Sequence, residues 1–451
     1  MSKQEKEQIK NYLKILKKYN RYTGFYDISN ELIKKYNDNT FQKTTVCATA
    51  PILVSYVLWV LQEAQKLKIN NLYFLSRDGE VLYKIAKKIC KKYNWNISCK
   101  YVYFSRKSLR APIYYLNPKE GISYIFSKGS NMSLDLILER AGVTSTEKEK
   151  ICYEIGIPVD NLNYSINGDD LNKLKEKLIK NQRFKDNIWK HSKSSWKLIK
   201  EYFYQERFHE EKKAAIVDSG WIGSMQKNLV YLLKKADIQI DLHGFYFGLF
   251  KSKKQLDEKY HAFYFQEIKE FYYGIFFNNN LFECLCAANH GMTIGYKKQD
   301  GVIIPIFKNY IPNPRIELQQ KICEEYAENI EMVENSRINL RKYIYKIIVL
   351  FMTSPSIEEI EQYGSINFCD DMTESYYYSL ANRISISEYF RHLFVIQLLS
   401  KFIKSLELNP KLKSYWIWGT IERFPQPIKY LYKIDQTIYQ LLFWIKIHMG
   451  D

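Results

Sequence analysis

Residues 70–89, with the sequence NNLYFLSRDGEVLYKIAKKI, hold the pattern that decides the fold. The apolar, β-prone residues 72–75 predict a buried strand, and the polar turn SRDG follows at 76–79. Apolar residues then recur at helical spacing over residues 80–93, which predicts an amphipathic helix. A strand that ends in a charged turn before a helix is typical of the active edge of an α/β sheet.

Further strands and helices are predicted on both sides of this unit. A strongly apolar helix is predicted over residues 47–68, and a second strand, ISCKYVYF, over 97–104. Residues 212–236, KKAAIVDSGWIGSMQKNLVYLLKKA, repeat the order of strand, glycine-bearing loop and helix, and two more strands are predicted at 240–250 and 259–265. This β-α-β succession predicts an α/β protein with a parallel sheet.

Three regions are predicted along the chain. Residues 1–44 are expected to form N-terminal helices, and residues 45–300 an α/β core. A polar, helical insertion at about 115–210 is expected to cap the strand ends of that core. Residues 301–451 are expected to form a mainly helical C-terminal domain, and no repeat or low-complexity linker marks the boundaries.

Composition excludes several classes of protein. The net charge of +18 can attract anionic partners, but it is spread over helix-like runs, and no zinc-finger, RNP or basic-zipper signature occurs, so we expect no nucleic-acid partner. The eight cysteines lack disulfide or zinc spacing, which indicates reduced thiols in the cytoplasm. We expect no signal peptide, and no apolar run reaches the roughly 18 residues that span a bilayer.

Polar loops follow three of the predicted strands, and in a parallel sheet these loops meet at one edge. Their cations suit an anion, their carboxylates suit hydroxyls, a metal or a proton, and their glycines allow close backbone approach. We therefore expect one crevice to be lined by Ser76, Arg77, Asp78 and Gly79, by Arg106, Lys107 and Arg110, and by Asp218, Ser219, Gly220, Trp221, Gly223 and Ser224.

The third loop, residues 218–224, predicts a site for a ribose phosphate. Successive backbone N–H groups entering a helix can bind a phosphate, with help from the helix dipole and the Ser224 hydroxyl. A carboxylate at the strand tip, here Asp218, suits a vicinal diol. The alternative is an ordinary tight turn, with Arg77 and Lys107 as solvated surface residues.

Residues 50–89, 101–112, 215–229 and LFECLCAANHGMTIGY at 281–296 resemble the domain that follows a haloacid-dehalogenase-type phosphatase domain in bacterial polysaccharide-cluster proteins. A phosphatase of that type needs Asp-x-Asp after its first strand, with the first carboxylate as nucleophile. Ser76 occupies that position here, so phosphatase activity is not expected.

The order of the three loops is similar to that in type I phosphoribosyltransferases. In that family a diphosphate loop follows the first core strand, a basic pair often follows the second, and an acidic loop grips ribose 5-phosphate. The chain departs from this pattern at Ser219, where a second acid is usual, and at Gly223-Ser224, where Thr-Gly-x-Thr is expected. The departures leave the acid/base assignment open.

Resemblance to glycan phosphoribosyltransferases implies transfer of 5-phosphoribosyl from PRPP to a hydroxyl of a surface polysaccharide or lipid-linked glycan, with Mg²⁺. A separate phosphatase would then leave a ribofuranose residue in the capsule or other polysaccharide. Arg77, Arg106 and Lys107 would stabilise the leaving diphosphate. Asp218 would hold the ribose hydroxyls, and the backbone of residues 220–224 would bind the 5-phosphate.

Asp78 is predicted to contact the metal or to accept the proton of the acceptor hydroxyl, with Glu283 as the alternative. His290, from the same segment as Glu283, is expected at the rim of the crevice. Two other functions stay open. One is a non-catalytic subunit of a capsule assembly system that binds a sugar phosphate or nucleotide, and the other is a glycosyltransferase with another activated donor.

The C-terminal residues 428–451 predict an amphipathic helix. If the acceptor is lipid-linked, this helix or another basic face would bring the enzyme to the inner face of the cell membrane. The alternative is a helix packed on the core. The predicted stripe comprises Ile428, Tyr432, Ile434, Ile438, Leu441, Leu442 and Ile445, with Lys429, Lys433 and Lys446 nearby.

Overall fold

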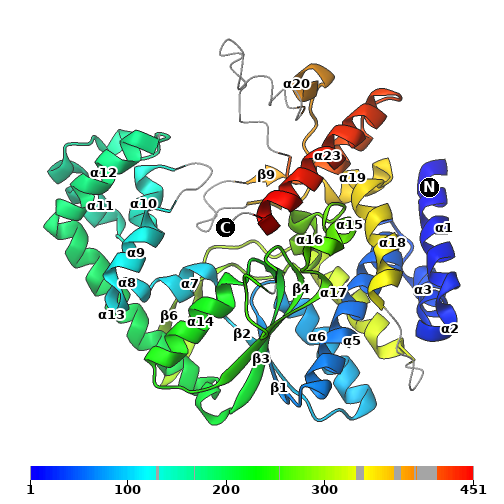
Figure 1. The fold of residues 1–451 in the computed structure, drawn as a ribbon, viewed down its shortest axis with the longest axis horizontal. Helices are drawn as coiled ribbons and strands as arrows, with labels where there is room; N and C mark the ends of the chain where they lie inside the picture. Colours follow the sequence, from blue (N-terminus) through cyan, green and yellow to red (C-terminus); the bar gives the residue numbers. More distant parts are fainter. Residues whose placement is uncertain are drawn as a thin grey trace.

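The sheet at the centre of the molecule has five parallel strands in the order β2-β1-β3-β4-β5. The computed structural model describes residues 2–127, 132–166, 168–252, 254–331, 340–369, 377–390, 393 and 414–449. The strands are β1 Asn71–Leu75, β2 Ser98–Val102, β3 Lys213–Trp221, β4 Asp241–Leu249 and β5 Tyr260–Phe265. This confirms the predicted α/β class with a parallel sheet, a helical insertion and a mainly helical C-terminal region (Figure 1).

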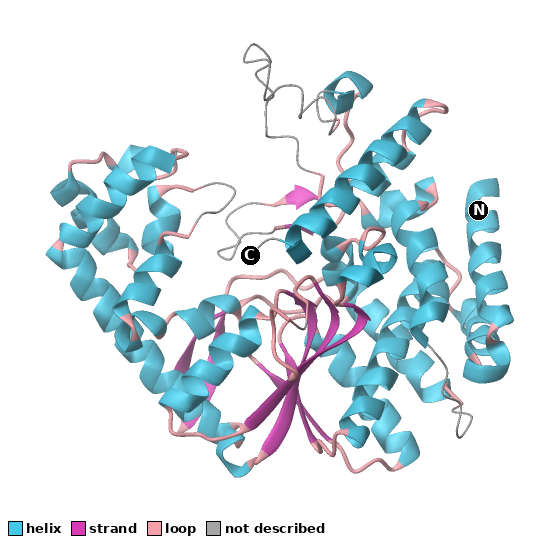
Figure 2. Cartoon of the chain, in the orientation of Figure 1, coloured by secondary structure: helices cyan, strands magenta, loops and turns pink. Residues whose placement is uncertain are grey.

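Helices cover both faces of the sheet (Figure 2). Successive strand residues point to opposite faces, so Phe74 and Val217 pack on one side while Leu75 and Ile216 pack on the other. Because both faces are buried, the strands are nearly continuous apolar runs. The helices before and beside the sheet are α1 Lys3–Lys18, α2 Asn20–Thr23, α3 Phe25–Lys35, α4 Thr40–Thr44, α5 Ala50–Lys66, α6 Gly79–Tyr93 and α14 Ser224–Lys235.

One long helix underlies the sheet over residues 40–66, made of α4, a π-helical turn at Thr45–Thr49 and α5. Among the described residues it is the one helix long and apolar enough to cross a membrane by length and composition. However, 94% of its most apolar 18-residue window is buried inside the protein. Packing against the sheet therefore accounts for its apolar sequence, including Leu53 and Val57, which are fully buried.

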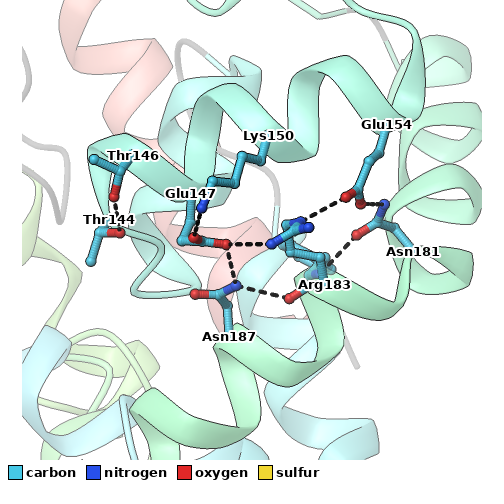
Figure 3. A network of polar contacts seen from close by, with 9 residues as sticks. Thr144, Thr146, Glu147, Lys150, Glu154, Asn181, Arg183 and Asn187 are labelled. Carbon is cyan, nitrogen blue, oxygen red and sulfur yellow. Dashed lines mark hydrogen bonds and ion pairs between the residues drawn. The ribbon is translucent and has the colours of Figure 1, made fainter.

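The helical insertion lies between β2 and β3 and has a hydrophobic core of its own, which includes Ile137, Ile151 and Phe184. Charged contacts join α11 to α13 on its surface: Arg183 lies 3.2 Å from the Glu147 carboxylate and 2.6 Å from that of Glu154 (Figure 3). The helix α7 Arg106–Arg110 follows β2 and packs against β6 and α14. The helices of the insertion are α8 Ile113–Leu116, α9 Pro118–Ile125, α10 Leu134–Arg140, α11 Ser145–Ile155, α12 Gly168–Lys180 and α13 Gln182–Gln205.

A single hydrophobic core joins residues from all three predicted regions, among them Tyr12, Leu53, Ile347 and Trp444. The predicted boundary at residue 301 falls in the turn of the antiparallel hairpin β6–β7. The elements after β5 are α15 Phe271–Gly274, α16 Asn279–Leu285, β6 Thr293–Gln299, β7 Val302–Phe307, α17 Pro314–Asn329, α18 Leu340–Thr353, α19 Ile357–Tyr363, β8 Asn367–Phe368, β9 Tyr378–Ser379, α20 Ile386–Phe390, α22 Ile417–Glu422 and α23 Ile428–Met449.

Gly79 allows α6 to begin directly against β1. A Cβ atom at this position would lie 2.9 Å from the backbone carbonyl carbon of Phe74, which cannot move without disturbing the strand. We expect Gly79→Ala to destabilise the fold by about 1–3 kcal/mol through overpacking. Gly168, which also begins a helix, has open space around it, so Gly168→Ala is the matched control. Equal thermal unfolding midpoints for the two variants would contradict this role of Gly79.

Candidate functional site

The candidate site lies where the strand order of the sheet reverses. The chain passes from β1 to β2 on one side of β1, and then returns to place β3 on its other side. In open parallel sheets the loops diverge at this switch point, and ligands bind outside the carboxyl ends of the two strands. Asp78 follows β1 and Asp218 lies near the end of β3, so both carboxylates are at this point.

Three carboxylates gather there from different parts of the chain: Asp78, Asp218 and Glu283 of α16. All three side chains are half-buried. The Ser219 hydroxyl donates a hydrogen bond to the Asp78 carboxylate. The Asn279 amide, one helical turn before Glu283, donates to the Glu283 carboxylate over 2.7 Å. Protein groups therefore orient the acids.

Burial and mutual repulsion raise the pKa values of this group. Burial, followed by the charge of Asp78, raises the pKa of Asp218 to about 8. The same two causes raise the pKa of Glu283 to about 7. Burial also raises the pKa of Asp78, although the hydrogen bond from Ser219 opposes the change. Near neutral pH the cluster therefore exchanges protons with its surroundings, as acid and base catalysts do.

Two arginines face the acid cluster. Arg77 precedes Asp78 in the turn after β1, and Arg106 is the first residue of α7 after β2. Both lower the pKa of Asp78 and of Glu283 through their positive charge, and Arg106 also lowers that of Asp218. Their charges only partly compensate three carboxylates, so the site has room for further positive charge.

The sheet and the helix beneath it fix the position of Asp218. The Tyr56 hydroxyl of α5 lies 2.8 Å from the carbonyl oxygen of Asp218 and 2.8 Å from that of Phe245 in the neighbouring strand. This bridge ties α5 to β3 and β4 directly below the carboxylate. Tyr56 was not predicted as part of the site. Its place within the apolar run at 47–68 does indicate a buried hydroxyl, which needs a hydrogen-bond partner in the protein.

The predicted phosphate loop at 218–224 needs correction. Residues 218–221 belong to β3, with Gly220 paired to Gly248 of β4, and only residues 222–223 form the turn before α14. A Cβ atom on Gly220 would lie 2.1 Å from the Gly248 carbonyl oxygen, so this glycine serves strand packing. Gly223 precedes α14 in a left-handed conformation and makes no side-chain cap, so the first N–H groups of α14 at Ser224 lack a capping side chain.

Several predicted residues have other partners in the protein. Lys107 lies 2.8 Å from the Glu139 carboxylate of α10, and Arg110 stacks on the Tyr124 ring, so both face the insertion. The Ser76 hydroxyl donates to the Phe104 carbonyl over 2.9 Å. Trp221 packs on Phe250 with ring centroids 4.8 Å apart, and 42% of its surface remains exposed.

His290 lies beside the cluster. Its Nε2 is 2.7 Å from the Tyr101 hydroxyl, and its Nδ1 is 2.8 Å from the Gly291 carbonyl. Burial lowers the pKa of His290, so the ring is neutral at pH 7. Rings of Tyr103 and Phe307 lie 5.6 and 4.8 Å from it, and together they form an aromatic wall that the sequence did not predict.

No three His, Cys, Asp or Glu side chains converge as metal ligands in the described part of the chain. The acid cluster therefore does not form a metal cage made by protein alone. It does fit Mg²⁺, which binds proteins through one or two carboxylates while substrate phosphates and water complete its coordination.

No protein-family model matches the chain. No curated protein is similar enough to count as a match.

The acid cluster predicts a specific dependence of stability on pH. Unfolded Asp and Glu titrate near pH 4, whereas Asp218 and Glu283 titrate at about 8 and 7 in the fold. A raised folded pKa means that the stabilisation present below pH 4 is lost as the pH rises through 8. We expect Asp218→Asn to unfold about 2 °C or more above wild type at pH 8, with a smaller difference at pH 5.

Differential scanning calorimetry at the two pH values measures this effect. Asp237→Asn, on the exposed turn after α14, is the matched control and should show no pH-dependent difference. A difference for Asp218→Asn that is no larger at pH 8 than at pH 5 would mean that this carboxyl is ionised without penalty.

Proposed function

We propose that the chain is a glycan phosphoribosyltransferase that transfers 5-phosphoribosyl from PRPP to a hydroxyl of a bacterial polysaccharide or lipid-linked glycan precursor. One observation carries the proposal. Three carboxylates with raised pKa values and two arginines meet at the switch point of a parallel sheet. Transfer from PRPP needs negative groups for a cationic sugar and positive groups for a departing diphosphate, and this site offers both.

Arg77 and Arg106 bind the diphosphate of PRPP in this proposal. Guanidinium groups suit phosphate oxygens because their planar N–H donors match them in pairs. Mg²⁺, when bound, neutralises part of the diphosphate charge and so makes it a better leaving group. Asp78 is the residue that would hold the ion. It follows Arg77, which binds the diphosphate in this proposal, and its charge acts on both other carboxylates of the cluster.

Asp218 holds the ribose. As the bond between the anomeric carbon and the diphosphate oxygen breaks, positive charge develops on the ribose ring. The raised pKa of Asp218 would be lowered by Mg²⁺ and by this developing charge, so that the side chain stabilises the sugar as a carboxylate. The 5-phosphate lies against the start of α14, where backbone N–H groups from Ser224 onward are not capped by a side chain. The Ser219 hydroxyl has no role in binding the ribose in this proposal, since it donates its hydrogen bond to Asp78.

Glu283 is the base. The acceptor hydroxyl oxygen forms the new bond to the anomeric carbon and gives its proton to the Glu283 carboxylate, so the products are the phosphoribosylated glycan, diphosphate and one proton. A pKa of about 7 suits this task, because a base that titrates near the working pH is both deprotonated and able to accept. A separate phosphatase then removes the 5-phosphate. We propose that the transferase itself is located in the cytoplasm.

Diphosphate release from PRPP in the presence of candidate glycan acceptors tests the proposal. Wild type should release diphosphate only with PRPP, Mg²⁺ and an acceptor. We expect Asp218→Asn to lose at least about a hundredfold in turnover, because the change removes the charge but keeps the shape. Near-normal turnover by this variant, with its fold intact, would remove Asp218 from the reaction.

Ligand-induced thermal stabilisation separates the proposal from its two alternatives. A ligand that binds the folded state raises the unfolding temperature by mass action. PRPP with Mg²⁺ should stabilise wild type more than nucleotide sugars do. Greater stabilisation by a nucleotide sugar would favour another activated donor, and stabilisation by PRPP without turnover on any acceptor would favour a binding subunit.

Arg77→Ala should weaken PRPP binding by roughly 10- to 150-fold, because it removes a charge-assisted contact worth about 1.5–3 kcal/mol. Titration of PRPP in the diphosphate assay measures the change. The control is Lys234→Ala, which removes an exposed cation in the last turn of α14. Equal PRPP dependence for the two variants would show that Arg77 does not contact the donor.

A further inference from the structure

The helix α23 exposes a continuous apolar face. Five aliphatic side chains, spaced three or four residues apart and so on one side of the helix, are between 36% and 64% exposed. We call them the α23 apolar face: Leu431, Ile434, Ile438, Leu442 and Ile445. Tyr430 and Tyr439, also exposed, lie beside it.

The opposite side of α23 is anchored in the protein. Trp444 is buried against Phe250 and Phe265, and its ring N–H donates to the Ile268 carbonyl over 3.0 Å. Near the start of the helix, Tyr432 is buried and packs on Tyr389 with ring centroids 4.3 Å apart. The predicted stripe is therefore divided, because Tyr432 belongs to the core while its aliphatic members from residue 434 onward include four that face outward.

Packing among the residues that the structure describes thus does not explain the α23 apolar face. Isolated exposed apolar residues are ordinary, but a contiguous stripe marks an interaction surface. The anchored side already supplies the burial that holds the helix in place. The five aliphatic residues on the outer side are left partly exposed to solvent.

We propose that the α23 apolar face inserts into the surface of a membrane with anionic phospholipid headgroups. An interfacial helix buries an apolar face at the headgroup boundary, with tyrosines and basic residues at its edges. One exposed lysine, Lys446, follows Ile445 on α23 itself. Two more exposed lysines come from segments that contact the C-terminal half of the helix: Lys269 in the short helix Ile268–Glu270, and Lys254 next to Gln255, whose amide donates to the Ile447 carbonyl. These lysines attract anionic headgroups.

The charges also argue against a second copy of the chain as the occupant. The helix carries one acidic residue, Asp435, and three lysines, of which Lys429 and Lys433 form ion pairs with Glu422 while Lys446 is exposed. The whole chain has a net charge of +18. Two copies facing each other through α23 would bring Lys446 and its neighbours together, and like charges across an interface are unfavourable. An anionic surface is complementary.

The place of α23 in the fold gives this surface a consequence, which rests on the proposed function. Its C-terminal half is fastened to the carboxyl ends of β4 and β5 through Trp444 and His448, whose Nε2 lies 3.2 Å from the Gln266 carbonyl. That is the sheet edge that carries the acid cluster. Membrane contact therefore places the site next to the bilayer, so that the acceptor is a lipid-linked glycan in the inner leaflet.

Vesicle co-sedimentation of the full chain tests the surface. Wild type should bind vesicles of phosphatidylcholine and phosphatidylglycerol more tightly than phosphatidylcholine alone, and added salt should weaken binding. We expect the double variant Ile434→Ser/Leu442→Ser to bind at least about tenfold more weakly. The matched control is Val230→Ser/Val302→Ser, which changes two exposed aliphatic residues elsewhere and should bind like wild type.

Two results would overturn the inference: no vesicle binding by wild type, or equal binding by the double variant and the control. Light scattering of the free protein adds a third, since a wild-type dimer that the double variant loses would make the face a contact between copies. Diphosphate release with a soluble acceptor is measured in parallel. Vesicle binding without turnover would refute the proposed transferase and leave the membrane surface standing.

Discussion

Repulsion among Asp78, Asp218 and Glu283 is the constraint on which the rest of the site depends. Three half-buried carboxylates cannot all ionise near one another without compensating positive charge. The protein supplies that charge only in part, through Arg77 and Arg106. In the proposed reaction, Mg²⁺ and the positive charge that develops on the ribose would complete the balance, while the diphosphate of PRPP would lie against the two arginines.

The residues that maintain this arrangement come from the whole chain. Tyr56 belongs to the long helix beneath the sheet, Asn279 orients Glu283 from within α16, and Lys107 links α7 to the insertion. Because α7 also carries Arg106, the contact between Lys107 and Glu139 connects the packing of the insertion with the position of a charged group in the site. The common core of the N-terminal and C-terminal helices gives the sheet edge a rigid support.

Local pattern was sufficient to predict much of the fold. The apolar runs at 71–75 and 213–217 predict β1 and most of β3, because strands buried on both faces leave a continuous signal. The sequence did not predict that β3 extends through Gly220, since a glycine usually indicates a turn, whereas here the close Gly248 carbonyl of β4 requires a residue without a side chain. Partners far apart in sequence, such as Lys107 with Glu139 or Tyr101 with His290, follow from tertiary packing, and one sequence carries no signal of them.

The separate core of the insertion has a consequence for how the chain folds. Strands β1 and β3 are neighbours in the sheet, yet they are far apart along the chain, because β2 and the whole insertion lie between them. Such distant pairing slows folding, since a long loop must close first. The first and last helices of the insertion meet, because the Tyr115 backbone N–H of α8 donates to the Ser192 hydroxyl of α13 over 2.9 Å. Once the insertion has folded around Ile137 and Phe184, it acts as a short connection between β2 and β3. The conformational entropy lost when β3 pairs with β1 is then smaller.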